Sequence, residues 1–600
     1  MKGSVPVHSR VHDAAHKWRR YIVLMVVSAL YAAAARGDEG VVGSPHDLSA
    51  TGPGTVHALN EGQVCIFCHA AHNATGQSPL WNRFDPQTHY RIYESSTTDA
   101  RIDQPSGPSK MCLSCHDGAM AIGLIASQPA TEPIAMTRRT LPPGPSDLTE
   151  DLSDDHPIGF RYDRALAARD RQLKNPDMLT DNLPLGAHGE VHCTTCHDPH
   201  DNTLGDFLRA PTVRSAICLS CHELFGWDAS SHANSPAAVR DRAVDSRERL
   251  QFHTVGDNGC ASCHKIHSAT RPEQLLRFRR EEDNCLNCHS GGVARTNIES
   301  EFRKRSAHPV VLSDSRHEAG EDARVAPRHV ECADCHNPHA VQPNESSAVA
   351  RALGRIDSVP VPVDATMRFV SGVDRGGRAV DHSRFEYEVC FKCHADNASR
   401  GSGSDIVRQV HQLNTRLEFQ PNNPSFHPVL GPRRNSDVVS LLEPYQVGSV
   451  LSCTDCHNSD SAGDGPLGLP AGPHGSIYEP LLVDNYETAE FVTESPRAYA
   501  LCYRCHERES ILGDESFSLH NIHVVRGRAS CSACHDAHGI SRTQGNDRAH
   551  SNLINFDLAQ VRPVSQATGS RIVFEDRGLY RGSCTLTCHG VTHVGFEYGR

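Results

Sequence analysis

The chain has 600 residues, of which 38% are hydrophobic and only 6% aromatic, while 45 Gly, 36 Pro, 39 His and 24 Cys are present. The usual core residues are scarce for a chain of this length, so we expect something other than side chains to fill the interior. The formal net charge of −13 excludes the basic face that a nucleic-acid partner requires.

The first 35 residues are typical of an export signal. Lys17, Arg19 and Arg20 precede an apolar run, 21–35, that ends in small residues. This run is shorter than the roughly 20 residues that span a bilayer, and no later stretch could span one. The first cysteine of the chain is Cys65, so no lipidation cysteine stands near the expected cleavage point. We therefore expect an exported protein without a retained membrane span.

All cysteines fall into twelve pairs, and a histidine follows each pair directly. Eleven pairs have the spacing C-x-x-C-H, and the last, CTLTCH, has one extra residue. The paired cysteines are Cys65 and Cys68, Cys112 and Cys115, Cys193 and Cys196, Cys218 and Cys221, Cys260 and Cys263, Cys285 and Cys288, Cys332 and Cys335, Cys390 and Cys393, Cys453 and Cys456, Cys502 and Cys505, Cys531 and Cys534, and Cys584 and Cys588. The histidines that follow them are His69, His116, His197, His222, His264, His289, His336, His394, His457, His506, His535 and His589.

This spacing predicts covalently bound haem c. Two thiols three residues apart lie on one face of a helical turn and can form thioethers with the two haem vinyl groups, and the next histidine then binds the iron. Zinc sites and disulfide frameworks do not require a histidine after every pair, and thioredoxin-like chemistry needs a single pair on an α/β scaffold. The sequence therefore predicts twelve haems, with eleven as the alternative because of the longer last motif.

Each iron has a second axial position, and the spare histidines are numerous enough to fill it. Only five methionines lie beyond the signal segment, whereas 24 histidines remain after the motif and signal histidines are removed. Ligation by two histidines is therefore the natural reading, and it implies low reduction potentials. The candidate second ligands are His46, His72, His156, His200, His232, His267, His308, His339, His427, His474, His520 and His538. Competing candidates are His57, His188, His192, His253, His329, His523 and His593.

The motifs recur in pairs and predict six dihaem repeats after the signal peptide of residues 1–35. The expected repeats are 36–150, 151–230, 231–300, 301–410, 411–515 and 516–600. Helices are expected at 166–173, at 238–250 and around each motif, and loops at 103–109 and 400–404. The predicted fold class is a multihaem cytochrome, mostly irregular, with short α-helices around an extended haem chain and little β-structure.

Particular strings around the motifs resemble the multihaem c-type cytochromes with doubled CXXCH motifs, a cytochrome c3-like group. They are VCIFCHAAHN followed by PLWNR at 79–83, KMCLSCHDG at 110–118, VHCTTCHDPH at 191–200 and CTLTCHG at 584–590. The resemblance implies haems stacked in pairs and a location outside the cytoplasm, either in the periplasm or at the outer membrane or cell exterior.

These observations predict an electron-transfer protein and not an enzyme, with no catalytic residue. Its expected partners are other cytochromes and an outer-membrane porin, and no nucleic acid. One alternative is a multihaem reductase of a small oxyanion or nitrogen compound, which needs an iron with an open axial position. Another is a subunit of a polymeric haem filament. Because structural metal sites couple to folding, the haem-free chain is expected to be largely unfolded.

Overall fold

A computed structural model describes residues 40–599, apart from 73, 76–79, 129–131, 240–249, 312–329, 343–358, 397–405, 433–436, 463–469 and 567–568. The predicted signal peptide lies outside the described residues. The chain divides into two compact units. Unit 1 comprises residues 1–223, 243–249 and 260–277, and unit 2 comprises 224–242, 250–259 and 278–600. No helix among the described residues is long and apolar enough to cross a membrane.

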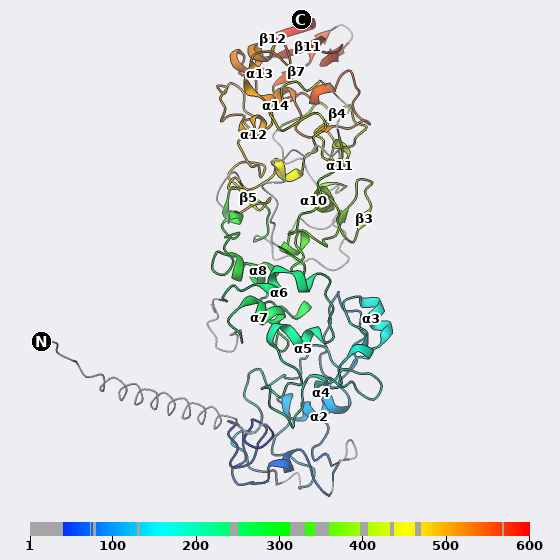
Figure 1. Ribbon diagram of the computed structural model, residues 1–600, viewed down its shortest axis with the longest axis vertical. Coiled ribbons are helices and arrows are strands. Elements are labelled where there is room, and N and C mark those ends of the chain that lie inside the picture. Colours follow the sequence, from blue (N-terminus) through cyan, green and yellow to red (C-terminus); the bar gives the residue numbers. More distant parts are fainter. Residues whose placement is uncertain are drawn as a thin grey trace, which may run out of the picture. The chain divides into compact units, whose positions relative to one another are not determined.

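Eleven of the twelve cysteine motifs lie on short helices or helical turns (Figure 1). In chain order these are η2 Val64–Phe67, α2 Gly107–His116, α4 Cys193–Cys196, α5 Ala216–Leu219, η7 Gly259–Ser262, α8 Glu281–His289, η10 Cys332–Asp334, α10 Glu386–His394, η11 Cys453–Asp455, α12 Ala500–Tyr503 and α14 Cys531–Cys534. The expectation of a helix around each motif is confirmed for these eleven.

The remaining helices are also short and connect the motifs. They are α3 Arg164–Asp170, η3 Pro176–Met178, η4 Val213–Ser215, η5 Trp227–Ala229, α6 Ser231–Asn234, α7 Val255–Asn258, η8 Glu273–Leu275, η9 Glu301–Arg303, α11 Thr415–Glu418, α13 Arg508–Leu512, the π-helical turn η12 Asn521–Arg526 and η13 Ser551–Leu553.

The described strands all belong to unit 2, and most are very short. The two-residue strands are β1 Ser306–Ala307, β2 Gly372–Val373, β3 Ala379–Val380, β4 Ser425–Phe426, β5 Gly475–Ser476, β6 Gly539–Ile540 and β7 Val561–Arg562. The longer ones are β8 Val564–Gln566, β9 Gly569–Arg571, β10 Val573–Asp576, β11 Gly582–Cys588 and β12 Val591–Tyr598. Antiparallel pairing in the order β10-β11-β12, with β7 also on β11, makes the largest sheet.

Buried apolar residues gather in small clusters and not in one core. The largest contains six buried residues around Tyr387 and Phe391 of α10, and another contains Phe160, Tyr162 and Leu166 near α3. Motif cysteines pack against several of these clusters. The predicted fold class, mostly irregular with short helices and little β-structure, is therefore confirmed.

The four local expectations have different outcomes. The helix expected at 166–173 is present as α3, which ends early because Arg171 adopts a left-handed conformation with φ of 61°. The loop expected at 103–109 is wrong at its end, since α2 begins at Gly107 and Pro108 occupies the first turn, where proline is tolerated. The helix expected at 238–250 and the loop at 400–404 lie mostly or wholly outside the described residues.

The expectation of a helix is wrong at the twelfth motif, which lies on strand β11. From Ser583 to Cys588 the sequence alternates polar and apolar residues, and two of the polar ones are β-branched threonines. This period of two is typical of a strand with one buried face. The extra residue between the two cysteines therefore goes with a change of secondary structure and not with a bulged helical turn.

Candidate haem sites

The eleven helical motifs share one hydrogen bond that closes the turn. The backbone N–H of the motif histidine donates to the carbonyl of the first cysteine, for example at 3.0 Å from His535 to Cys531 and at 2.8 Å from His457 to Cys453. This turn places the two thiols about 5–6 Å apart on one side, with the imidazole directly after them. The local geometry therefore suits attachment of one haem through two thioethers.

Ten motif histidines each lie opposite a second histidine, with the two rings in stacked, tilted or edge-on orientation. Their ring centroids are 6.0–6.5 Å apart. An iron held between two imidazole nitrogens, each at about 2.0 Å, needs ring centres about 6 Å apart. The pairs in unit 1 are His69–His200, His116–His46, His197–His267 and His222–His156. The pairs in unit 2 are His289–His232, His336–His474, His394–His308, His457–His538, His506–His427 and His535–His520.

Hydrogen bonds at Nδ1 orient many of these rings and leave Nε2 for the iron. Histidine ligands usually donate their other ring N–H to a carbonyl or carboxylate, which sets the tautomer and the ring orientation. Motif histidines bonded to backbone carbonyls are His116 (Ser146), His197 (Asp206), His264 (Gln274), His336 (Thr366), His457 (Pro480) and His535 (Asn552). Opposing histidines bonded in the same way are His156 (Pro157), His232 (Pro338), His308 (Pro473) and His427 (Ala537).

Two opposing histidines are instead bonded to carboxylates. Nδ1 of His267 lies 3.0 Å from Asp155 Oδ1, and Nδ1 of His538 lies 3.0 Å from Glu418 Oε2. Although burial lowers the pKa of His538, the hydrogen bond and charge of Glu418 leave it raised overall. A carboxylate behind a ligating imidazole increases its basicity, so if His267 and His538 held haem iron, these carboxylates would favour the ferric state.

Burial keeps other imidazoles of these pairs neutral, as a metal ligand must be. Burial, followed by the opposing ring of His116, lowers the pKa of His46 to about 4. In the same order of causes, the pKa of His474 falls to about 3 beside His336, and that of His520 falls to about 3 beside His535. The lone pair on Nε2 is therefore available at physiological pH.

The opposed pairs interlock neighbouring repeats of the sequence. A histidine that follows a first motif, such as His200 or His538, faces the first motif of the preceding repeat. A histidine upstream of a repeat, such as His156 or His427, faces the second motif of its own repeat. His72, which follows the motif at Cys65, takes part in none of these ring pairs. Its side chain is exposed and faces no other imidazole among the described residues.

Contacts between thiols follow the order of the motifs. Between the first cysteines of successive motifs a side-chain hydrogen bond shifts the pKa in four pairs: Cys112–Cys193, Cys218–Cys260, Cys390–Cys453 and Cys502–Cys531. Between second cysteines the pKa is raised by burial and then by the charge of the neighbouring thiol in five pairs: Cys68–Cys115, Cys196–Cys221, Cys335–Cys393, Cys456–Cys505 and Cys534–Cys588. Burial first, and then the neighbouring thiol of Cys115, raises the pKa of Cys68 to about 12.

The two kinds of contact alternate along the chain. A motif inside either run interacts with one neighbour through its first cysteine and with the other neighbour through its second. This order runs through motifs one to five in unit 1 and motifs seven to twelve in unit 2. Because each thiol is predicted to hold a vinyl edge of a haem, these contacts would place haem edges side by side in chain order.

The other candidate histidines lie in several kinds of surroundings. His339 has its ring centroid 6.2 Å from that of Trp227. Nδ1 of His57 lies 2.9 Å from the Gly54 carbonyl, and His192 lies 3.1 Å from Ser109 Oγ. His188 and His253 are exposed, and His329 lies outside the described residues.

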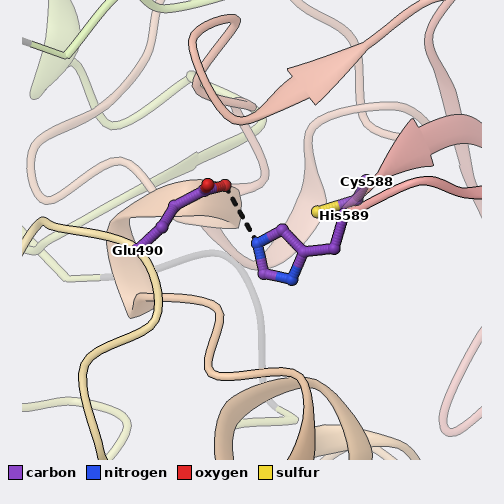
Figure 2. Close-up of side chains that lie close together, drawn as sticks. All are labelled: Glu490, Cys588 and His589. Atoms are coloured by element: carbon purple, nitrogen blue, oxygen red, sulfur yellow. Dashed lines mark hydrogen bonds and ion pairs between the residues drawn. The ribbon is translucent and has the colours of Figure 1, made fainter.

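At the twelfth motif the His589 imidazole makes its hydrogen bond through Nε2 and not through Nδ1. His589 Nε2 lies 2.9 Å from Glu490 Oε1, with the Cys588 thiol beside them, as Figure 2 shows. His589 and Gly590, with φ of 50° and 75°, are the two central residues of the tight turn that joins β11 to β12. On a strand, cysteines four residues apart lie roughly 13 Å from each other. This motif therefore does not present two thiols and an imidazole as the helical motifs do.

Sequence reasoning named ten of the histidines found opposite a motif imidazole but not the order in which they pair. The pairing joins residues 15 to 138 positions apart, and only tertiary structure brings them together. The strand at the twelfth motif did leave a signal, since residues 583–588 alternate in polarity and end before His-Gly.

Comparison with known proteins agrees with the doubled motif. A family model described as "Doubled CXXCH motif" matches residues 186–225 and 253–294. Over 182 residues the chain is 26% identical to the multiheme cytochrome MtrA of Shewanella baltica. This alignment covers 26% of the present chain and 41% of that protein. The chain therefore spans less than half the length of this relative.

Proposed function

Because the chain is a multihaem c-type cytochrome with doubled CXXCH motifs, we propose that it conducts electrons along covalently bound haems and does not transform a substrate. The observation that carries the proposal is the alternation of thiol contacts from one motif to the next within each unit. The haems, when bound, supply one-electron ferric/ferrous couples close enough to exchange electrons.

The residues of the chain hold and tune these groups. The paired cysteines attach them, the histidines of the eleven helical motifs bind the iron on one side, and the opposing histidines bind it on the other. The proposed second ligands include the ten that face a motif imidazole, and His72 and His339 remain sequence predictions. Two imidazoles on each iron favour low potentials, and Asp155 and Glu418 would lower two of them further.

The same proposal includes location and partners. The 1–35 segment is typical of an export signal, so the protein would act in the periplasm or at the outer membrane or cell exterior. The relative is described as a multiheme cytochrome, and other cytochromes are the proposed redox partners, with an outer-membrane porin as a further one. The six dihaem repeats between 36 and 600 remain a proposal about how the sequence is organised.

A reductase would need an iron with an open axial position. The ten motif histidines that already face an imidazole favour electron transfer over this alternative. Low-temperature electron paramagnetic resonance of the oxidised, haem-loaded protein tests the choice. We expect only low-spin ferric signals, whereas a substantial high-spin signal in the unmodified protein would favour the reductase.

A further inference from the structure

The pairing pattern of the repeats changes at the eleventh and twelfth motifs. In the earlier repeats the upstream histidine faces the second motif of its own repeat, as His427 faces His506. In the last repeat the upstream histidine, His520, faces the first motif instead, at His535. Among the described residues no histidine lies opposite His589, so the axial ligands of the twelfth motif have to be sought outside this pattern.

Two histidines that belong to no motif face each other beside this motif. The ring centroids of His523 and His593 are 6.5 Å apart, the same separation as in the pair His427–His506. Nδ1 of His523 lies 2.7 Å from the Leu519 carbonyl, so it donates there and leaves Nε2 for a metal. His523 also lies on the π-helical turn η12, a distortion that is frequent at functional sites. This pair thus has the ring spacing of the other pairs and their Nδ1 hydrogen bond.

The β11–β12 hairpin brings His593 and the two cysteines to the same side. His593 is the direct cross-strand partner of Leu586, and such partners project from the same face of a sheet. Cys584 and Cys588 lie two residues before and after Leu586, so alternation places them on that face too. Leu586, Cys584 and Cys588 pack in one apolar cluster. The opposite face is polar, with Thr587 Oγ1 3.0 Å from Thr592 Oγ1.

His589, in contrast, lies at the turn and is already engaged. Its Nε2, the atom left free in the oriented histidines of the helical motifs, is hydrogen-bonded to Glu490 (Figure 2). Its ring packs on Phe491 at 4.7 Å between centroids, and it faces no other imidazole among the described residues. Iron ligation by His589 would require both contacts to break.

We propose that His523 and His593, and not His589, are the axial ligands of the twelfth haem. The inference rests on the proposed haem attachment at the other motifs. One thioether, from Cys584 or Cys588, is enough to attach this haem. It forms when the thiol adds across a vinyl group: the S–H bond breaks, an S–C bond forms, and the hydrogen goes to the adjacent vinyl carbon, with no oxidant consumed.

The test compares single variants of the full haem-loaded protein by intact mass and low-temperature electron paramagnetic resonance. The unmodified protein should carry twelve haems. His523→Ala and His593→Ala should each convert about one iron in twelve to high spin, whereas His589→Ala should leave every iron low-spin. His188→Ala, at an exposed histidine far along the sequence, is the control for loss of a spare histidine. A mass with eleven haems, or high-spin iron in His589→Ala alone, overturns the inference.

A conservative variant distinguishes loss of an iron ligand from loss of local structure. Since a methionine ligand raises the potential of a haem with histidine on the other side, His593→Met should keep the iron low-spin and shift one haem to higher potential in a redox titration. No shift would mean that residue 593 is not a ligand. High-spin iron in the unmodified protein would instead count against the proposed function, so the two failures are distinguishable.

Discussion

The eleventh and twelfth motifs pack in the same apolar cluster yet fold in opposite ways. In CSACH, the turn α14 brings Cys531 and Cys534 together, and the His535 amide closes it. In CTLTCH, strand β11 separates the cysteines and places His589 in a hairpin turn. The Cys534 and Cys588 thiols are still neighbours. The comparison teaches that one extra residue between the cysteines goes with a strand in place of a helical turn, and that the motif histidine then lies in a different position.

The largest expected effect is the loss of folded structure when haem cannot be attached to the motifs. The buried apolar clusters contain only three to six residues each, too few to stabilise a chain of this size without the cofactor. A chain in which all motif cysteines are serine should lose most of its fixed structure, as measured by far-ultraviolet circular dichroism. A cooperative thermal transition in that chain would contradict this expectation.

The next effect is the loss of one axial ligand from a helical motif. His520→Ala removes the ring opposite His535, so about one iron in twelve should become high-spin in paramagnetic resonance. His57→Ala is the matched control, because His57 is bonded to Gly54 and faces no imidazole among the described residues. An equal high-spin signal in both variants would mean that the ring pairs do not report ligation.

A smaller effect, on the reduction potential of one haem, is expected to differ between two carboxylates that contact their histidines at different ring nitrogens. Glu418 is bonded to Nδ1 of His538, and Glu490 to Nε2 of His589. Glu418→Gln should raise the potential of one haem, by about 59 mV if ferric binding weakens tenfold relative to ferrous. Glu490→Gln should shift none. A shift of similar size in the Glu490→Gln protein would show that His589 ligates iron after all.

The smallest effect concerns the hairpin turn itself. Gly590 has φ of 75° and open space around it, so alanine there meets backbone strain and no steric clash. Gly590→Ala should destabilise the β11–β12 hairpin by about 1 kcal/mol, seen as faster hydrogen exchange of residues 591–598 with unchanged spin states. Gly448→Ala, also in open space but without a positive φ, should have no such effect. Equal exchange in the two variants would exclude backbone strain as the cause.

The sequence by itself determined the chemistry of the sites. Twelve cysteine pairs followed by histidine, the scarcity of methionine and the surplus of histidine predict haem c with two imidazoles per iron. The small number of core residues also predicts the irregular fold, because a long helix or strand needs a continuous apolar face to bury, and few apolar side chains are present to form one. These conclusions rest on residue types and short spacings, which are properties of the local chain.

Tertiary structure alone decided which histidines face each other. His538 faces His457 of the preceding repeat, and His520 faces His535 and not the second motif of its repeat. Such pairs depend on how distant segments pack, which no local pattern records. The fold also determined the conformation of the last motif, because pairing with β10 and β12 holds CTLTCH as a strand. The hairpin places His589 beside Glu490, and His593 lies opposite His523.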